Sequence, residues 1–269
     1  MTLALLLLLL GTLVLSQGSS LYNSPLTAND RPIIGILAQE THFEELQTFG
    51  KSYIAASYVK TIESAGARVI PILLNLAEEE YEKIFNSING ILFPGGAVDL
   101  VKSEYARVAK IFYNQALEAN DKGDYFPIWG TCLGFEELTY LSSGEILLTL
   151  TETEDISLPL NFSSNALNSK LFKHLPKELY TALSSKPITA NFHYWSLSMQ
   201  NFTKNEKLSK FYNVLTTNSD GSVEFISTFE ARKSSHHFTK EEDETKVLIY
   251  NYFPKNTGNI SVFQQMYFF

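Results

Sequence analysis

The sequence contains only one cysteine, Cys132, in a chain of 269 residues. One cysteine cannot form an internal disulfide, so Cys132 is a free thiol that is either buried and inert or kept for its reactivity. The five histidines and this cysteine show no metal-ligand spacing, so the sequence predicts no metal site and no cofactor. A net charge of −8 without a basic cluster argues against a nucleic-acid partner.

Long apolar runs are also scarce. The longest, Leu3 to Leu15, is too short to cross a bilayer, so it predicts no membrane span. It has the length of a secretory signal h-region and is followed by the small residues Ser16 to Ser20, apart from Gln17. No Lys or Arg precedes the run, so only the α-amino group supplies positive charge. We expect residues 1–20 to be a signal peptide.

Three acceptor sequons for N-glycosylation begin at Asn161, Asn201 and Asn259. Such sequons are used only in a chain that enters the secretory pathway. Together with the leader they predict a protein that is secreted to the extracellular space or delivered to the lysosome, with glycan on at least one of the three.

After the leader, residues 21–269 are enough for a single α/β domain. The hydrophobic pattern predicts strands at 32–38, 67–73, 90–96 and 125–129, and helices at 52–66, 77–88, 105–120 and 133–144. Gly66 and Gly144 are expected to end two of these helices. Alternating strands and helices are typical of a parallel sheet covered on both faces.

Ligands of such sheets bind beyond the carboxyl ends of the strands, where two glycine-containing loops fall. The loop from Gly130 to Gly134 has the form G-x-nucleophile-x-G, with a strand before it and a helix after it. The helix N-terminus favours thiolate over thiol. We therefore expect Cys132 to attack a carbonyl, with the N–H groups of Gly96 and Leu133 stabilising the oxyanion.

These residues resemble the class I glutamine amidotransferases and, more narrowly, the gamma-glutamyl hydrolases. The resemblance rests on "RPIIGILAQE", "SYIAASYVKTIESAGARVIPI", "INGILFPGG", "WGTCLGFEELTYL", "NFHYWSLS" and the tail from His236 to Tyr267. It implies a doubly wound, mostly parallel sheet flanked by helices. It also implies hydrolysis of gamma-linked glutamate amide bonds in folate and antifolate poly-gamma-glutamates, and a homodimer.

The resemblance implies roles for individual residues as well. Cys132 matches the nucleophile, with Gly96 and Leu133 as the oxyanion donors. His193 matches a histidine of the family's active-site cleft, although a histidine held by structural hydrogen bonds is the alternative. Glu136 either contacts substrate or is a solvated helix residue.

One departure from the family pattern concerns the catalytic base. The family continues after the strand resembling "GSVEFISTFE" with a Trp-His-Pro-Glu motif and a helix, whereas here Glu230 is followed directly by Ala231, which resembles the end of that helix. We interpret this join as an internal deletion that removes a late strand, a helix and the base. His236 and His237 follow the join and are expected to form a solvated polar turn.

Three functions remain open. The first is a cysteine-dependent gamma-glutamyl hydrolase whose activity is impaired. The second is a catalytically inactive splice-type variant that binds folate polyglutamates or the full-length subunit. An amidotransferase subunit that supplies ammonia to a synthase is disfavoured, because the chain carries no synthase domain.

Overall fold

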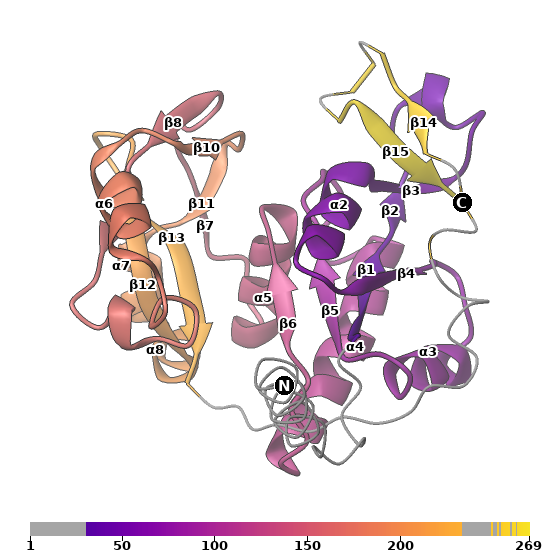
Figure 1. Cartoon of the computed structure of the whole chain (residues 1–269), viewed down its shortest axis with the longest axis horizontal. Coiled ribbons are helices and arrows are strands. Elements are labelled where there is room, and N and C mark those ends of the chain that lie inside the picture. The colour runs from indigo at the N-terminus through magenta and orange to yellow at the C-terminus, as the bar shows by residue number, and fades with distance from the viewer. Residues whose placement is uncertain (1–30, 233–248, 250–251, 253, 259, 262) are drawn as a thin grey trace, which may run out of the picture. The chain divides into compact units, whose positions relative to one another are not determined.

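The computed structural model describes residues 31–232, 249, 252, 254–258, 260–261 and 263–269 (Figure 1). The expected signal peptide, His236, His237 and Asn259 lie outside these residues. Within the described part of the chain, no helix has the length and apolar character needed to cross a membrane.

The centre of the fold is a four-stranded parallel sheet. Its strands are β1 (Ile33–Leu37), β4 (Arg68–Ile72), β5 (Gly90–Phe93) and β6 (Ile128–Gly130), in the order β4-β1-β5-β6. β4 and β5 consist entirely of buried residues, which is why they read as continuous apolar runs in the sequence. The predicted parallel sheet is confirmed.

Helices connect these strands and cover the sheet. α2 (Ala56–Ser64) packs on β1 and β4, α4 (Glu104–Asp121) packs on β1, and α5 (Leu133–Ser143) packs on β5 and β6. α4 also contacts both α3 (Glu78–Phe85) and α5. The chain adds β4 on one side of β1 and β5 on the other. Right-handed crossovers therefore place α2 on the face opposite α3 and α4, as in a doubly wound sheet.

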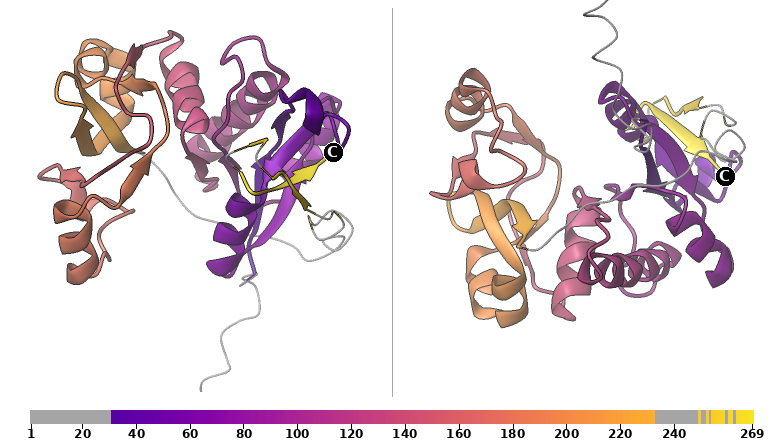
Figure 2. Two further views of the ribbon diagram at one scale, coloured as in Figure 1. Left: turned by 90° about the horizontal axis from the view of Figure 1, so that it is seen from above. Right: turned by 60° about the horizontal axis from the view of Figure 1, so that its bottom comes forward.

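The predicted helix at 52–66 is wrong in its first four residues. Ser52–Ala55 forms a strand, β3, in which all four residues are buried. β3 lies between β2 (Gln39–Glu40) and β15 (Gln265–Phe268), and β14 (Lys255–Asn256) completes the antiparallel order β14-β15-β3-β2. Both views of Figure 2 show the yellow C-terminal strand alongside the indigo N-terminal segment. This distant pairing overrides the local helical spacing of Ile54.

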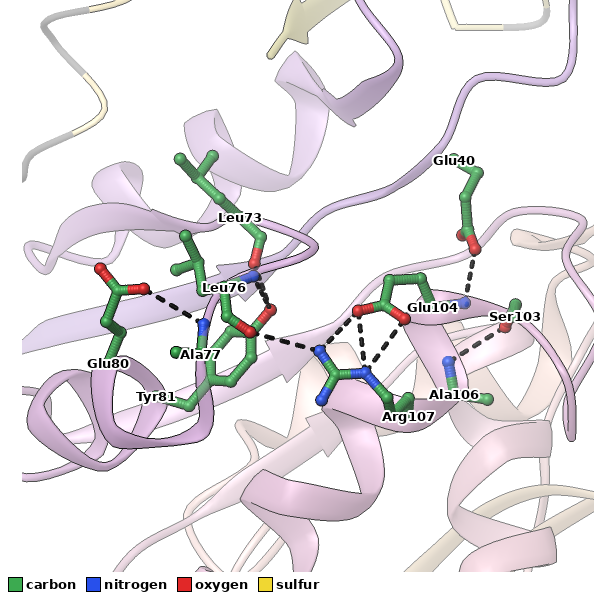
Figure 3. A network of polar contacts seen from close by, with 10 residues as sticks. All are labelled: Glu40, Leu73, Leu76, Ala77, Glu80, Tyr81, Ser103, Glu104, Ala106 and Arg107. Carbon is green, nitrogen blue, oxygen red and sulfur yellow. Dashed lines mark hydrogen bonds and ion pairs between the residues drawn. The ribbon is translucent and has the colours of Figure 1, made fainter.

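A polar network fixes the N-terminus of α4 (Figure 3). The Ser103 hydroxyl accepts a hydrogen bond from the Ala106 N–H at 3.0 Å, which is a standard helix cap. Glu40 reaches across from β2, and its Oε1 accepts the Glu104 N–H at 2.6 Å. The side chain of Glu40 thus ties the short strand β2 to the start of α4.

Residues 145–231 form smaller antiparallel sheets. β7 (Leu148–Leu150) pairs with β11 (Trp195–Leu197), and β8 (Ile156–Leu158) pairs with β10 (Thr189–Asn191). β12 (Tyr212–Ser219) lies between β9 (Asn161–Phe162) and β13 (Glu224–Ala231). The helices of this segment are α6 (Lys177–Ser185), α7 (Met199–Lys204) and α8 (Glu206–Phe211), and it contains a short 3-10 turn, η2 (Ala166–Asn168). A second 3-10 turn, η1 (Glu44–Leu46), lies earlier in the chain, between β2 and β3.

The segment is anchored to α5, the helix that follows Cys132. The rings of Phe135 and Phe229 stack with centroids 4.4 Å apart, and the hydroxyls of Ser142 and Tyr212 are 2.8 Å apart. Residues of α5 therefore pack on the parallel sheet with one side and on β12 and β13 with another.

The join between Glu230 and Ala231 lies inside β13. Ala231 pairs with Tyr212, and the Arg232 N–H donates to the Phe211 carbonyl at 3.0 Å. Ala231 therefore continues a strand rather than ending a helix, because the backbone groups at the start of β12 are available to it. The Glu230 carboxylate accepts the N–H groups of Lys170 and Leu171 at 3.1 and 3.0 Å, which fixes this end of the strand.

Candidate active site

Cys132 occupies the turn between β6 and α5. It is a non-glycine residue with positive φ, at φ 53° and ψ −114°, which costs conformational energy that the surrounding fold must offset. The Phe135 and Glu136 N–H groups both donate to the Cys132 carbonyl, at 2.9 and 3.1 Å, so the helix begins directly after the cysteine. This is the strand-turn-helix geometry that the G-x-nucleophile-x-G pattern predicts.

The two glycines of the pattern are needed because backbone segments meet closely. A Cβ on Gly130 would overlap the carbonyl of Gly134, and a Cβ on Gly134 would overlap the carbonyl of Phe93. The start of α5 is thereby brought against the end of β5. The absence of side chains at both positions is what places Cys132 at the carboxyl edge of the parallel sheet.

Two backbone N–H groups act on the Cys132 sulfur, those of Leu133 and Gly96. Both lower the pKa of the thiol, because they hydrogen-bond the thiolate form. They come from the two loops that the sequence places at the carboxyl edge of the sheet. The residues predicted as oxyanion donors are therefore brought together around the nucleophile.

The net pKa of Cys132 nevertheless moves upward, contrary to the prediction from the helix N-terminus. Burial of the thiol raises its pKa most, the Glu136 carboxylate raises it further, and the N–H groups of Leu133 and Gly96 offset only part of this increase. The prediction from the sequence included the effect of the helix N-terminus on the thiol pKa. It did not include the effect of desolvation or of the Glu136 carboxyl one turn away.

Glu136 lies on the first turn of α5 and interacts electrostatically with the thiol. Burial raises its pKa to about 7. A carboxyl with this pKa exchanges its proton near neutrality, so it is not an ordinary solvated helix residue. Of the two interpretations that the sequence left open, the position beside the nucleophile favours substrate contact.

Glu137 is a residue that the sequence patterns do not single out. It is fully buried, and neither of its carboxyl oxygens has a hydrogen-bond partner among the described residues. Burial, followed by the charge of Asp99, raises its pKa to about 8, so it holds a proton at neutral pH. The only sign of its burial in the sequence is that a charged residue occupies a helix position where an apolar residue is expected.

His193 lies between β10 and β11, with its ring hydrogen-bonded at both nitrogens. Nδ1 is 3.1 Å from the Thr153 hydroxyl and 3.3 Å from that of Ser196, and Nε2 is 3.2 Å from Oδ1 of Asn191. Burial lowers its pKa, which keeps the ring neutral. In the part of the chain that the structure describes, no hydrogen bond joins His193 to Cys132.

The sequons differ in their surroundings. Asn161 is exposed at the start of β9, whereas the Asn201 side-chain nitrogen donates to the Leu147 carbonyl at 2.8 Å and to the Thr149 hydroxyl at 3.2 Å. Asn259 lies outside the described residues. Across the described ranges, no group of three or more His, Cys, Asp or Glu side chains is arranged to hold a metal ion.

Comparison with known proteins gives a family match. The Peptidase C26 family model matches residues 32–236. Gamma-glutamyl hydrolase of Bos taurus is 50% identical over 300 aligned positions, covering 94% of each chain, and that of Homo sapiens is 51% identical over 285, covering 89% of this chain and 90% of its own. Gamma-glutamyl hydrolase B of Dictyostelium discoideum is 38% identical, covering 90% and 84%. The glutaminase domain of Trypanosoma brucei CTPS with bound acivicin aligns with a TM-score of 0.47 and 11% identity, covering 74% of this chain and 81% of its own.

These alignments are longer than the part of this chain that they cover. In the bovine alignment, 94% of 269 residues is about 253, so about 47 of the 300 aligned positions have no residue in this chain. The human alignment leaves about 46 of 285 positions without one, since 89% of 269 is about 239. The relatives therefore carry residues within the matched region that this chain lacks.

Proposed function

This chain belongs to the Peptidase C26 family, and we propose that it acts on gamma-linked glutamate amide bonds of folate poly-gamma-glutamates with Cys132 as the nucleophile. The observation that carries the proposal is the strained turn at Cys132, where the N–H groups of Gly96 and Leu133 converge on the sulfur. The names of the gamma-glutamyl hydrolases that it resembles support the substrate class.

In this proposal the Cys132 thiolate attacks the gamma-carbonyl carbon, and the carbonyl oxygen becomes an oxyanion that accepts hydrogen bonds from Gly96 and Leu133. The C–N bond then breaks, and the amine leaves after gaining a proton. Water attacks the resulting thioester, releases the gamma-carboxylate and returns the thiol. Glu136 faces the same space and is proposed to contact the substrate.

The leaving amine must gain a proton, and the scheme above names no residue that supplies it. We propose that the chain lacks the family's base through a deletion between Glu230 and Ala231. The alignments, each with about 46 or 47 unmatched positions, support a missing block of that size. β6 fits the loss of a neighbouring strand, because among the described residues it pairs on one side only. Positioned proton transfer contributes about 10²–10⁴-fold, so turnover is expected to be close to nil.

His193 is the alternative source of the proton. The resemblance places it in the cleft, but its ring nitrogens already face Thr153, Asn191 and Ser196, and burial lowers its pKa, which disfavours the protonated form. We therefore assign it at most a weak substitute role.

A non-catalytic role is the second candidate. The join leaves β13 paired along its length, so the surrounding sheet does not depend on the missing block. A chain that folds but does not turn over substrate would bind folate polyglutamates or the full-length subunit, the latter through the homodimer expected from the family. Secretion or lysosomal delivery is part of the same proposal, supported by the leader and the sequons.

The test compares hydrolysis of a pteroyl poly-gamma-glutamate with iodoacetamide labelling of Cys132. The chain, its Cys132→Ser and His193→Ala variants, and a version with the family's missing block restored are measured together. Labelling without hydrolysis in the chain, and hydrolysis in the restored version, is the expected result. Turnover in the chain equal to that of the restored version would show that a base is encoded elsewhere.

A further inference from the structure

The loop that supplies the Gly96 N–H is held by two side chains, those of Gln39 and Tyr58. Gln39 Nε2 donates to the Gly95 carbonyl at 2.7 Å, and the Tyr58 hydroxyl accepts the Gly95 N–H at 2.9 Å. We propose that Gln39 and Tyr58 are positioning residues that fix the Gly95–Gly96 peptide with its N–H directed at Cys132. The inference rests on the proposed function, in which that N–H stabilises the oxyanion.

The geometry of the peptide bond explains how Gln39 acts at a distance. The Gly95 carbonyl and the Gly96 N–H belong to one planar trans peptide, so they point in opposite directions. A hydrogen bond that holds the carbonyl toward Gln39 therefore holds the N–H away from Gln39 and toward the sulfur. Loss of the Gln39 donor frees this peptide to rotate, since glycine on both sides allows many backbone conformations.

Gln39 is an unusual residue for its position. It is only 1% exposed at the start of β2, directly after the buried residues Leu37 and Ala38, and its Oε1 has no hydrogen-bond partner among the described residues. An unpartnered buried polar atom destabilises the fold, and an apolar side chain would avoid that cost. The amide is consistent with selection for the hydrogen bond to Gly95 rather than for stability.

The amide is held in place by its neighbours. Gln39 pairs with Tyr53 in the β2-β3 ladder, and Glu40 ties β2 to the N-terminus of α4 (Figure 3). The approach to the loop is close, because a Cβ on Gly96 would overlap the Gln39 amide. A glycine is therefore required opposite Gln39.

Tyr58 acts on the preceding peptide. An ideal Cβ on Gly95 would lie 2.7 Å from the Tyr58 hydroxyl, 3.0 Å from Cys132 Cβ and 3.6 Å from Cys132 Sγ. Gly95 is thus packed between the tyrosine and the nucleophile. With its N–H bonded to Tyr58 and its carbonyl to Gln39, both peptides that meet at Gly95 are fixed.

The test is the pH dependence of iodoacetamide alkylation of Cys132 in the full chain, from pH 5 to 10.5. The Gly96 N–H lowers the thiol pKa, so Gln39→Leu and Tyr58→Phe should each slow alkylation about three- to tenfold below the thiol pKa. As the pH approaches and passes the thiol pKa, a growing share of the thiol is ionised in every variant, and the rates should converge. A residue that served only the stability of the fold would not produce this pH-dependent difference.

Thr41→Val is the matched control. Thr41 is also buried, lies two residues from Gln39 and has a hydroxyl without a partner among the described residues, so its profile should match that of the unmodified chain. Should Gln39→Leu aggregate, Tyr58→Phe and the uncharged Gln39→Met, which is similar to glutamine in size, carry the test by the same criterion. Superimposable profiles for folded variants would overturn the proposal. Alkylation needs no folate substrate, so this failure is distinguishable from failure of the proposed hydrolysis.

Discussion

Replacing Glu136 by Gln removes the carboxylate that acts on the nucleophile without changing the size of the side chain. Glu136 is four residues beyond Cys132, half-buried, and its pKa is raised to about 7 by burial. Below pH 7 the carboxyl is largely neutral and has little effect on the thiol. Above pH 7 it is ionised and opposes formation of the neighbouring thiolate, which raises the Cys132 pKa.

The size of the effect follows from the spacing. Residues four apart at the start of a helix are about 6 Å apart, and two unit charges at that distance repel by about 3 kcal/mol at an effective dielectric constant of 20 and about 0.7 kcal/mol in water. A half-buried carboxyl lies between these limits, at about 1.4 kcal/mol, which is one pKa unit. Glu136→Gln should therefore lower the thiol pKa by about one unit, but only where Glu136 is ionised.

The assay is the rate of iodoacetamide alkylation of Cys132 between pH 5 and 10.5. The two chains should react equally below about pH 6, the variant should react about tenfold faster from about pH 8 up to the thiol pKa, and the rates should converge when the thiol is fully ionised. Glu118→Gln, an exposed carboxylate on α4, is the control and should follow the unmodified chain. Identical profiles for Glu136→Gln and the unmodified chain would refute the electrostatic argument.

Three further predictions concern stability and glycosylation. Between pH 4.5 and 8 the native state keeps a proton on Glu137 that the unfolded chain releases, so this residue lowers stability as the pH rises. Glu137→Met should therefore increase the unfolding free energy at pH 8 by about 1–3 kcal/mol, seen as a higher melting temperature, and should increase it less at pH 5. No pH dependence in that difference would contradict it. Gly134→Ala should lower the urea-derived unfolding free energy by about 1–3 kcal/mol, because the added Cβ overlaps the Phe93 carbonyl, and an unchanged midpoint would count against this packing. In a secreting cell, Asn161→Gln should remove a glycosidase-sensitive mobility shift that Asn201→Gln leaves, since the Asn201 amide is already hydrogen-bonded; the reverse pattern would show that Asn201 carries the glycan.

Hydrophobic periodicity predicts the central fold well because β1, β4 and β5 are short, largely buried runs, and the connecting helices carry apolar residues at helical spacing. Gly144 ends α5 in the left-handed conformation, at φ 77°, as its position in the sequence indicates. The prediction fails at Ser52–Ala55, where the partner that makes the segment a strand is Gln265–Phe268, some two hundred residues later. Local spacing cannot report a pairing of that range.

In the candidate site, too, the local features can be predicted from the sequence and the features that depend on distant contacts cannot. The turn at Cys132 and its two glycines are a local motif, so the sequence identifies them directly. Gln39 and Glu137 each stand beside another polar residue in the sequence, and only the structure shows that these two side chains are buried. The pKa of the Cys132 thiol also cannot be predicted from the sequence, because desolvation and the effect of the Glu136 charge depend on how α5 is buried.

The residues that surround the Cys132 thiol come from the first half of the chain. Gln39 lies in β2 and Tyr58 in α2, whereas Gly96 and Cys132 lie in loops at the carboxyl edge of the parallel sheet; all four precede residue 144. The join at Glu230 and Ala231 lies in β13, whose pairing with β12 continues through it. Alkylation of Cys132 reports on the residues around the sulfur alone. Labelling of the thiol can therefore not by itself be taken as evidence of hydrolysis, which also needs a proton for the leaving amine.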